Sequence, residues 1–405
     1  MKKLLSFMLA FSMSSNVAIT VVACGTNSEK TDESKTQFNL NNFYVIGDSL
    51  SDAGGYKNLA QSLIYSKDPT SKYKYEFSGN FESKIYENKY PSYSNGKTAV
   101  EWINNLLGFE GMMKPAGELM IDAIVKDGRN YAVGGAKASS DIKFSFGEAG
   151  FGRPGVDLKV DIVSQAKSLV SQHKLSSNDI VFMEMGGNDM FAGIEAYFSG
   201  GGINKFNEII NEATINIDKA LSLVLKTGAK VMYMNSPDIT LVPTVQGGEL
   251  DRNGEVTVLS KLAVTMKDYI HEKLDLTFYN KTSQVIEDLK FTYKDNLVLF
   301  DLFKDFGGLI NEYKTLFKNT FDKDVNSINN YGYDTTIYEG DNKLVQRNTT
   351  IKTNNDKDID TFFYIDQVHP TRYVHQYIGK KIYNMMVDDW FFGKDKVEIS
   401  LDKIN

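Results

Sequence analysis

A serine, an aspartate and a histidine, far apart in this 405-residue chain, have the side chains that nucleophilic catalysis requires. Ser49 stands at the end of the apolar run "FYVIGDS". A serine hydroxyl is a weak nucleophile until a base takes its proton, and a third group must orient that base. Asp366 and His369 are three residues apart in "DQVH", so on a turn the carboxylate reaches one imidazole nitrogen and the other faces a cleft. The three residues predict a serine nucleophile with His369 as its base.

Simpler interpretations exist for both segments. Asp and Ser also cap helix N-termini, so "GDS" could start a helix. A capping Asp366 beside a surface histidine would explain "DQVH". The remaining histidines are weaker candidates for a base, because His173 ends a predicted helix, His271 lies within one, and His375 belongs to the closing helix.

Two glycine-containing turns are candidates for stabilising a negatively charged acyl-transfer intermediate. "GGND" closes an apolar run, so the Asn188 amide can point into a cleft. "VGG" closes another, and Gly134 lets a backbone N–H approach a substrate closely. Each turn alone also fits an ordinary strand-to-helix connection, with Gly at positive φ and Asn as a cap.

These residues must be positioned by strands and helices that alternate along the chain. Apolar runs typical of buried strands end near residues 47, 133, 185, 235 and 301. Longer amphipathic stretches separate them, including 203–228, 260–290 and 372–391. This alternation predicts an α/β fold with a central, mostly parallel sheet of about five strands, covered on both faces. Ligands of such sheets bind at the carboxyl ends of the strands, where the candidate residues lie.

Two polar stretches interrupt this alternation. Residues 65–95 are rich in Tyr, Lys, Ser and Asn, and residues 309–360 are rich in Asn, Asp and Tyr. We interpret both as loop insertions at the mouth of a site, within a single domain over residues 41–395. The aromatic residues of such loops could contact sugar or acyl groups, although a purely solvated insertion fits equally well.

Taken together and in order, "GDSLSD", "NYAVGGA", "GGND" and "DQVHPT" resemble the GDSL family of the SGNH hydrolase superfamily. The four signature residue types of that family are present as Ser49, Gly134, Asn188 and His369. "MNSPDITLVPT" is also similar to the larger GDSL lipases and esterases. The resemblance extends from about Phe43 to the closing helix.

The resemblance implies a three-layer α/β/α sandwich of flavodoxin-like type and a serine ester hydrolase. Ser49 would attack the acyl carbon, His369 would act as base and then as acid, and Asp366 would orient His369. The implied oxyanion hole consists of the backbone N–H groups of Ser49 and Gly134 and the side chain of Asn188. Gly135 is the alternative to Gly134 as the backbone donor.

The first residues have the layout of a bacterial lipoprotein signal. A basic start and an apolar stretch with small residues lead to "VVAC", and Cys24 is the one cysteine of the chain. We predict a signal peptide over residues 1–23, lipidation of Cys24, and a flexible tether over residues 24–40. The leader resembles those of wall-less bacteria such as mollicutes, which predicts a lipid-anchored protein on the extracellular face of the cell membrane. A plain cleaved signal with an incidental Cys24 is the alternative.

Composition narrows the function classes. The net charge is −7 and no block of basic residues is present, so nucleic acid is not an expected partner. A single cysteine excludes an intrachain disulfide, and no histidine cluster suggests a metal, so we predict neither metal nor cofactor. The leading hypothesis is an esterase or lipase acting on carboxylic esters such as phospholipid or lysophospholipid acyl chains. A carbohydrate O-acylesterase and a non-catalytic surface-binding lipoprotein are the alternatives.

Overall fold

The computed structural model describes residues 39–67, 70, 74–77, 92–109, 113–116, 128–144, 156–248, 258–327, 333–340, 343–351, 356–390 and 392–402. By internal contacts the chain separates into Met1–Thr36 and Gln37–Asn405, and the fold described below belongs to the second unit. The predicted signal peptide, Cys24 and most of the predicted tether lie outside the described residues. Among the described residues, no helix is both long and apolar enough to cross a membrane.

The centre of the fold is a four-stranded parallel sheet. Its order is β1-β5-β6-β7, formed by β1 (Asn42–Ile46), β5 (Asp179–Glu184), β6 (Lys230–Met234) and β7 (Leu297–Phe300). These are strands that the sequence predicts, and all three neighbouring pairs run parallel. The parallel α/β architecture is therefore confirmed.

The predicted strand ending near residue 133 is wrong as a regular strand. The segment runs beside β1, with a parallel bridge between Val45 and Asn130 and a 2.8 Å hydrogen bond from Tyr131 N–H to Val45 O. The Asn130 side chain accepts from the N–H of Ala132 and donates to the carbonyl of Ser51. This local side-chain bonding competes with regular strand pairing.

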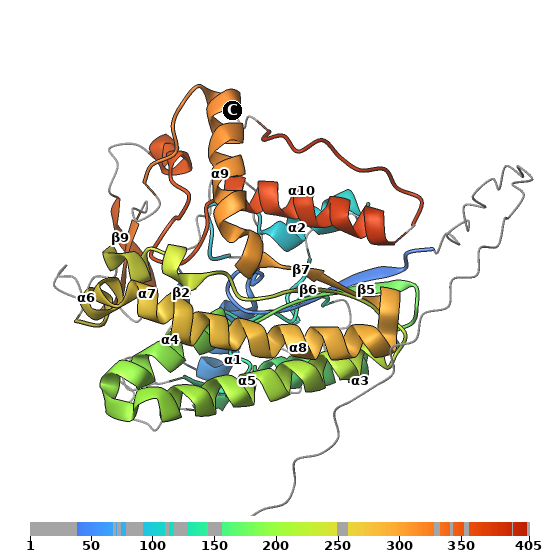
Figure 1. Ribbon diagram of the computed structural model, residues 1–405, viewed down its shortest axis with the longest axis horizontal. Coiled ribbons are helices and arrows are strands. Elements are labelled where there is room, and N and C mark those ends of the chain that lie inside the picture. Colours follow the sequence, from blue (N-terminus) through green and yellow to red (C-terminus); the bar gives the residue numbers. More distant parts are fainter. Residues whose placement is uncertain are drawn as a thin grey trace, which may run out of the picture. The chain divides into compact units, whose positions relative to one another are not determined.

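Helices cover both faces of the sheet (Figure 1). One face packs against α1 (Gly55–Lys67), α3 (Ile162–Gln172), α4 (Gly187–Ala196), α5 (Gly202–Leu225) and α8 (Leu276–Tyr293). The other packs against α2 (Ala99–Leu106), α9 (Leu302–Phe321) and α10 (Arg372–Asp389). Neighbouring strand residues alternate between the two cores, as Tyr44 and Phe43 do, because side chains of a strand point to opposite faces.

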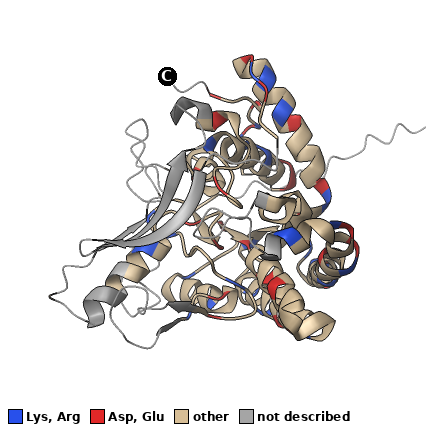
Figure 2. Ribbon diagram, turned by 90° about the vertical axis from the view of Figure 1, so that its left-hand side faces the viewer, with Lys and Arg blue, Asp and Glu red and all other residues tan. Residues whose placement is uncertain are grey.

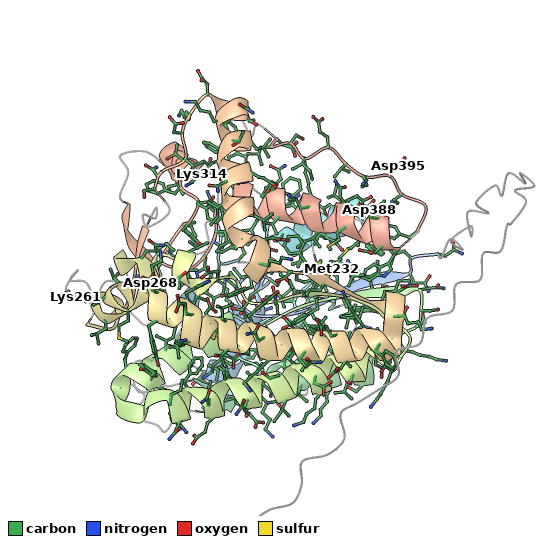
Figure 3. The ribbon with its side chains drawn as sticks, viewed as in Figure 1. Met232, Lys261, Asp268, Lys314, Asp388 and Asp395 are labelled. Atoms are coloured by element: carbon green, nitrogen blue, oxygen red, sulfur yellow. The ribbon has the colours of Figure 1, made fainter. Side chains whose placement is uncertain are left out.

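The distribution of side chains follows these layers. Met232 of β6 is fully buried, whereas Lys261, Asp268 and Asp388 are exposed on the outer elements (Figure 3). Lys and Arg are interspersed with Asp and Glu along the helices (Figure 2). Burial of the apolar helix faces against the sheet therefore holds the three layers together.

The predicted insertions contain regular structure, which corrects their interpretation as loops. The stretch assigned to the second insertion begins inside α9, where Leu309, Ile310, Tyr313 and Phe317 are buried at helical spacing. A small sheet, in the order β2-β9-β8, joins the two stretches through β2 (Lys74–Phe77), β8 (Tyr333–Gly340) and β9 (Lys343–Ile351). The first stretch also contains the end of α1.

Two further differences concern the remaining elements. The helix predicted over 260–290 is divided into α6 (Val258–Thr265), α7 (Lys267–Tyr269), a π-helical turn (Ile270–Asp275) and α8. Between the "NYAVGGA" block and α3, β3 (Ile142–Phe144) pairs antiparallel with β4 (Val156–Leu158). Neither change moves the carboxyl ends of the parallel strands, where the candidate residues gather.

Candidate active site

Ser49 lies in a turn immediately after β1, at the carboxyl edge of the sheet. The turn is closed by a hydrogen bond from Asp52 N–H to Asp48 O at 3.0 Å, and α1 begins only at Gly55. The Asp48 carboxylate accepts the Leu50 N–H at 3.0 Å. Ser49 therefore does not cap a regular helix; it is held by a tight connection that directs its hydroxyl to the edge of the sheet.

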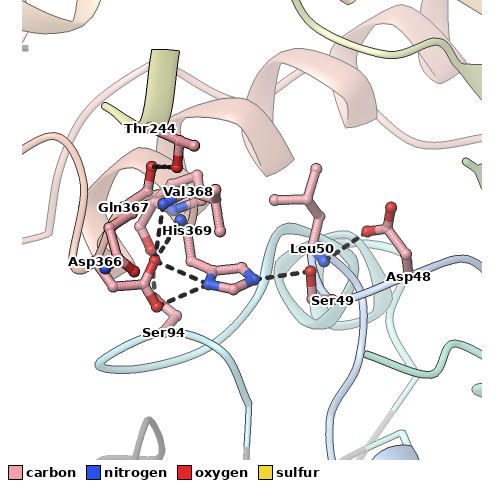
Figure 4. A network of polar contacts seen from close by, with 10 residues as sticks. Asp48, Ser49, Leu50, Ser94, Thr244, Asp366, Gln367, Val368 and His369 are labelled. Atoms are coloured by element: carbon pink, nitrogen blue, oxygen red, sulfur yellow. Dashed lines mark hydrogen bonds and ion pairs between the residues drawn. The ribbon is translucent and has the colours of Figure 1, made fainter. Parts of the chain in front are cut away.

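His369 joins Ser49 to Asp366 (Figure 4). Its Nε2 is 2.8 Å from the Ser49 hydroxyl oxygen, and its Nδ1 is 2.9 and 2.8 Å from the two carboxylate oxygens of Asp366. With Nδ1–H donated to the carboxylate, Nε2 is left as an acceptor for the serine proton. The structure thus brings together the three residues that the sequence singled out, in the geometry of a nucleophile, a base and an orienting acid.

The Asp366 carboxylate is fixed by its own loop. It is 7% exposed and accepts the backbone N–H groups of Val368 and His369 at 2.9 and 2.8 Å. Burial acts to raise the pKa of Asp366, but the His369 imidazole and these backbone donors outweigh it, so that the pKa lies below the usual value. Asp366 is therefore the ionised partner that an imidazolium at His369 requires.

The loop that carries His369 is held by residues 92–98. Ser94 donates its hydroxyl to Pro370 O at 3.0 Å. Asn95 accepts the N–H of Arg372, at the start of α10, at 2.8 Å, and donates to Asp360, which also forms an ion pair with Arg372. These contacts position the histidine loop from a segment more than 260 residues away in the chain.

Tyr93 lies next to His369 and belongs to the same segment, residues 92–98. Its ring centroid is 4.8 Å from that of His369, and its hydroxyl packs against the backbone at Gly134. The sequence placed this tyrosine in an insertion at the mouth of a site, and its ring does lie beside the candidate base.

Asn188 lies in the first turn of α4. This helix follows β5, the strand next to β1 in the sheet. Its side-chain amide donates to Asp48 at 3.1 Å and to Ala136 O at 3.0 Å. The next residue, Asp189, accepts the N–H groups of Ala138 and Ser139 at 2.8 Å each. The "GGND" block therefore fixes the loop that follows "VGG". Both N–H groups of the Asn188 amide have protein partners, so one must be released before it can serve an oxyanion.

The amide of Gly134 is directed away from the cleft, against its predicted role. Its N–H donates to the Asp52 carboxylate at 2.7 Å, and this buried carboxylate also accepts the N–H groups of Gly54, Gly55 and Tyr56. An N–H bound to a buried carboxylate is not available to a substrate.

The next residue fits the role better. Gly135 is exposed and has a φ of +76°, and none of the described residues accepts a hydrogen bond from its N–H. The geometry therefore favours Gly135, the alternative that the sequence left open.

An apolar cavity opens beside Ser49 and His369. It is lined by side chains of the helices on one face of the sheet, including Val100 of α2, Leu302 and Phe306 of α9, and Val374 and Ile378 of α10. Its polar lining includes Asp48, Ser49, Asn188 and His369, and hydrogen bonds join Asn188 to Asp48 and His369 to Ser49. The cavity therefore has the chemistry to hold an apolar chain whose polar end reaches the serine.

The comparisons agree with this geometry. A family model described as GDSL-like Lipase/Acylhydrolase matches residues 43–382, which is most of the chain. The chain belongs to this family. Accordingly, the protein is an ester-bond hydrolase. No curated protein matches the sequence.

Two positions around the site of this GDSL-like acylhydrolase were not found from the sequence. Glu184 ends β5 and accepts the Asp48 N–H at 2.7 Å, and Gln165 of α3 bonds the backbone of Gly47. His375, a weaker candidate for the base on sequence grounds, lines the cavity. His375 Nδ1 accepts the Ala99 N–H at the start of α2, at 3.2 Å. The sequence held a signal for each of the two missed positions: Glu184 is a polar residue at the end of an apolar strand, and Gln165 lies on the apolar face of a helix.

One group of described residues apart from Ser49, Asp366 and His369 has atoms suited to a cation. The potential ligand atoms of Asp238, His271 and Asp275 all lie within 4.8 Å of one another, and His271 Nδ1 is 3.3 Å from Asp238 Oδ2. Asp238 also accepts the Thr240 N–H at 3.0 Å, and Asp275 accepts the Ile239 N–H at 3.1 Å. These bonds brace the turn after β6. The absence of a metal requirement stays a prediction.

Proposed function

We propose that this acylhydrolase is a membrane-anchored serine esterase that cleaves carboxylic esters of lipid acyl chains through an acyl-enzyme on Ser49. The observation that carries the proposal is the continuous link from Asp366 through His369 to the Ser49 hydroxyl, with 2.8 Å at each end. A non-catalytic binding protein has no need for a buried acid, a correctly oriented imidazole and a serine in contact. The non-catalytic alternative is therefore disfavoured.

Each residue has a defined step in this mechanism. Ser49 Oγ attacks the ester carbonyl while His369 Nε2 takes its proton, and the resulting imidazolium is stabilised by Asp366. The negative charge on the former carbonyl oxygen is received by the backbone N–H groups of Ser49 and Gly135 and by the Asn188 amide. His369 then protonates the departing alcohol, and water repeats the sequence to release the acid from Ser49.

The cavity supports a lipid acyl chain over an acetyl group. Its lining includes Phe182, Phe191 and Met234 in addition to the helix residues above the sheet. Burying each methylene of an acyl chain in such a surface is favourable by about 0.8 kcal/mol. An acetyl group would leave most of this apolar surface unused, so we favour phospholipid or lysophospholipid acyl chains over acetylated sugars.

The N-terminal segment supports action at a membrane. Lipidation of Cys24 would hold the catalytic domain at the extracellular face of the cell membrane, close to lipid substrate. Incorporation of labelled fatty acid into the wild-type protein, and none into Cys24→Ala, is the expected result. Labelling that persists in Cys24→Ala would overturn the anchor without affecting the assignment of the esterase.

The central experiment compares hydrolysis of p-nitrophenyl esters by wild type, Ser49→Ala and the matched variant Ser171→Ala. Ser171 is an exposed serine of α3 whose hydroxyl donates to Ser168 O within the helix. We expect kcat to be lost in Ser49→Ala and retained in Ser171→Ala. Equal activity in wild type and Ser49→Ala would refute the mechanism. A preference for acetyl over longer acyl esters would instead support the carbohydrate esterase.

A further inference from the structure

Two carboxyl groups lie in contact directly beneath the turn that carries Ser49. Asp48 precedes the serine, and Glu184 ends the neighbouring strand β5. Asp48 is 4% exposed and Glu184 is 2% exposed. Neither has a step in the mechanism above, so the reason for burying two acids at this point must be sought in what they hold.

Glu184 holds the turn from below. Its Oε1 accepts the Asp48 N–H at 2.7 Å, and its carboxyl group also bonds the side chains of Asp48 and Ser51. A side chain at Gly47 would collide with the Glu184 carboxyl group, so the glycine of "GDS" permits this close approach. The two acids therefore form one unit with the nucleophile turn.

The contact requires a proton between the two acids. Two carboxylates have only acceptor oxygens, so a hydrogen bond between them exists only when one is protonated. Asp48 accepts from two groups that can only donate, Leu50 N–H at 3.0 Å and the Asn188 amide at 3.1 Å. Glu184 has one such donor, Asp48 N–H at 2.7 Å, because the Ser51 hydroxyl can also accept. Burial raises the pKa of Asp48 only to about 6, so Asp48 is ionised at pH 7. The proton therefore belongs on Glu184, which donates it to Asp48.

The electrostatic surroundings agree with this assignment. Burial and the negative charge of Asp48 raise the pKa of Glu184 well above its usual value. The other titratable groups facing the pair are Tyr233 of β6, Asp189 of α4 and His369 of the loop before α10. Asp189 adds negative charge and disfavours a second anion, while His369 favours an anion at Asp48.

We propose that Glu184 is a positioning residue for ester hydrolysis: its protonated carboxyl group donates a hydrogen bond to the Asp48 carboxylate and fixes the Ser49 turn relative to the Asn188 amide. This inference rests on the proposed function of Ser49 and Asn188. The linked groups run from Glu184 to Asp48 to Asn188, so loss of the shared proton places two anions in contact and releases the amide. Glutamine at 184 keeps one acceptor and one donor, and therefore replaces the protonated acid.

Infrared difference spectroscopy tests the proton directly and does not depend on catalysis. At pH 7, the wild-type minus Glu184→Gln spectrum is expected to contain the carbonyl band of a protonated carboxylic acid. The same band is expected in an Ser49→Ala background, so a failure of the proposed function leaves this measurement intact. A difference spectrum showing only a carboxylate at residue 184 would overturn the proposal.

Kinetics test the positioning role. We expect Glu184→Gln to keep kcat within about threefold at pH 7 and to lack the alkaline loss of kcat that wild type shows as Glu184 ionises. For Glu184→Ala, circular dichroism gives the folded fraction to which kcat is normalised. We expect this kcat to fall at least tenfold, with little change in KM. The control is Glu101→Gln, another buried glutamate, which caps α2 away from the turn. An identical alkaline loss in wild type and Glu184→Gln would contradict the role.

Discussion

The side-chain amide of Gln165 forms two hydrogen bonds with the backbone of Gly47, two residues before Ser49. Gln165 Oε1 accepts the Gly47 N–H and Gln165 Nε2 donates to the Gly47 carbonyl, both at 2.9 Å. A further bond from Nε2 to Val160 O at 2.8 Å satisfies the second amide hydrogen. Since Gln165 is fully buried on α3, the helix fixes the exit of β1 and with it the direction of the Ser49 turn.

Removing these hydrogen bonds is predicted to reduce both stability and catalysis. Gln165→Ala leaves the N–H and the carbonyl of Gly47 buried without partners, at about 1–3 kcal/mol for each such group. We expect the free energy of unfolding, from urea titration, to fall by about 2–4 kcal/mol, and kcat per folded molecule to fall as well. The control is Lys167→Ala on the exposed side of the same helix. Unchanged kcat in folded Gln165→Ala would show that these bonds serve stability alone.

The sequence was sufficient for the parts of the site that depend on local pattern. Asp366 and His369 are three residues apart, so a turn alone brings carboxylate and imidazole together. The four parallel strands are short, continuous apolar runs, because both of their faces are buried. The order of the four family blocks then placed Ser49 and His369 at one edge of the sheet, although 320 residues separate them.

Contacts between distant segments could not be read from pattern. Nothing near Gly134 indicates that its N–H is bound by Asp52, 82 residues earlier, so the sequence offered no reason to prefer Gly135 over Gly134. In the sequence, Glu184 is simply a polar residue at the end of a strand. Only the pairing of β5 with β1 brings it next to Gly47. Asn130 likewise disrupts a segment with the pattern of a strand, because its side chain finds partners that tertiary structure supplies.

The aspartate of the triad is predicted to act through His369. Asp366→Asn would place an amide against Nδ1 and favour the wrong imidazole tautomer, so we expect kcat for p-nitrophenyl esters to fall by ~10³–10⁴-fold with KM little changed. Asp305→Asn, on the exposed side of α9, is the charge-matched control. Retention of more than a tenth of wild-type kcat in Asp366→Asn would argue against this role.

The apolar cavity predicts a change in chain-length preference when it is narrowed. Ile378 of α10 lines the cavity, two turns beyond the start of the helix, and Ile378→Trp would occupy space that a long acyl chain needs. We expect kcat/KM for long-chain p-nitrophenyl esters to fall at least tenfold, with acetate hydrolysis changed less than threefold. Ile203→Trp at the exposed start of α5 is the size-matched control. A uniform loss for all chain lengths would mean that the acyl chain binds elsewhere.

Asn188 is predicted to exchange partners during the reaction. In a phosphonate adduct of Ser49, we expect a crystal structure to place the anionic oxygen within hydrogen-bond distance of Gly135 N–H and Asn188 Nδ2, with one of the contacts from Asn188 to Asp48 or Ala136 broken. Asn188→Ala is expected to reduce kcat by about 10²–10³-fold, as for loss of one oxyanion donor. An adduct in which the anionic oxygen contacts Gly134 N–H would reverse the choice between the two glycines.

His375 makes the stability of the fold depend on pH. Burial, together with the nearby His369, lowers the pKa of His375 from 6.5 to about 3. The unfolded chain therefore takes up a proton below pH 6.5 that the native protein does not, so this residue reduces stability as pH falls from 6.5 towards 3. The reduction is about 1.4 kcal/mol per pH unit, or roughly 2–3 kcal/mol between pH 6.5 and 4.5.

His375→Asn removes this titration and keeps an acceptor for the Ala99 N–H, since the asparagine Oδ1 occupies the place of Nδ1. Urea unfolding at pH 8 and pH 4.5 measures the effect. The variant is allowed a lower free energy of unfolding at pH 8, because the substitution changes packing. Between pH 8 and pH 4.5, its free energy of unfolding should fall by roughly 2–3 kcal/mol less than that of wild type. Because the other titrating groups are common to both proteins, parallel pH curves would mean that His375 accepts a proton in the native state.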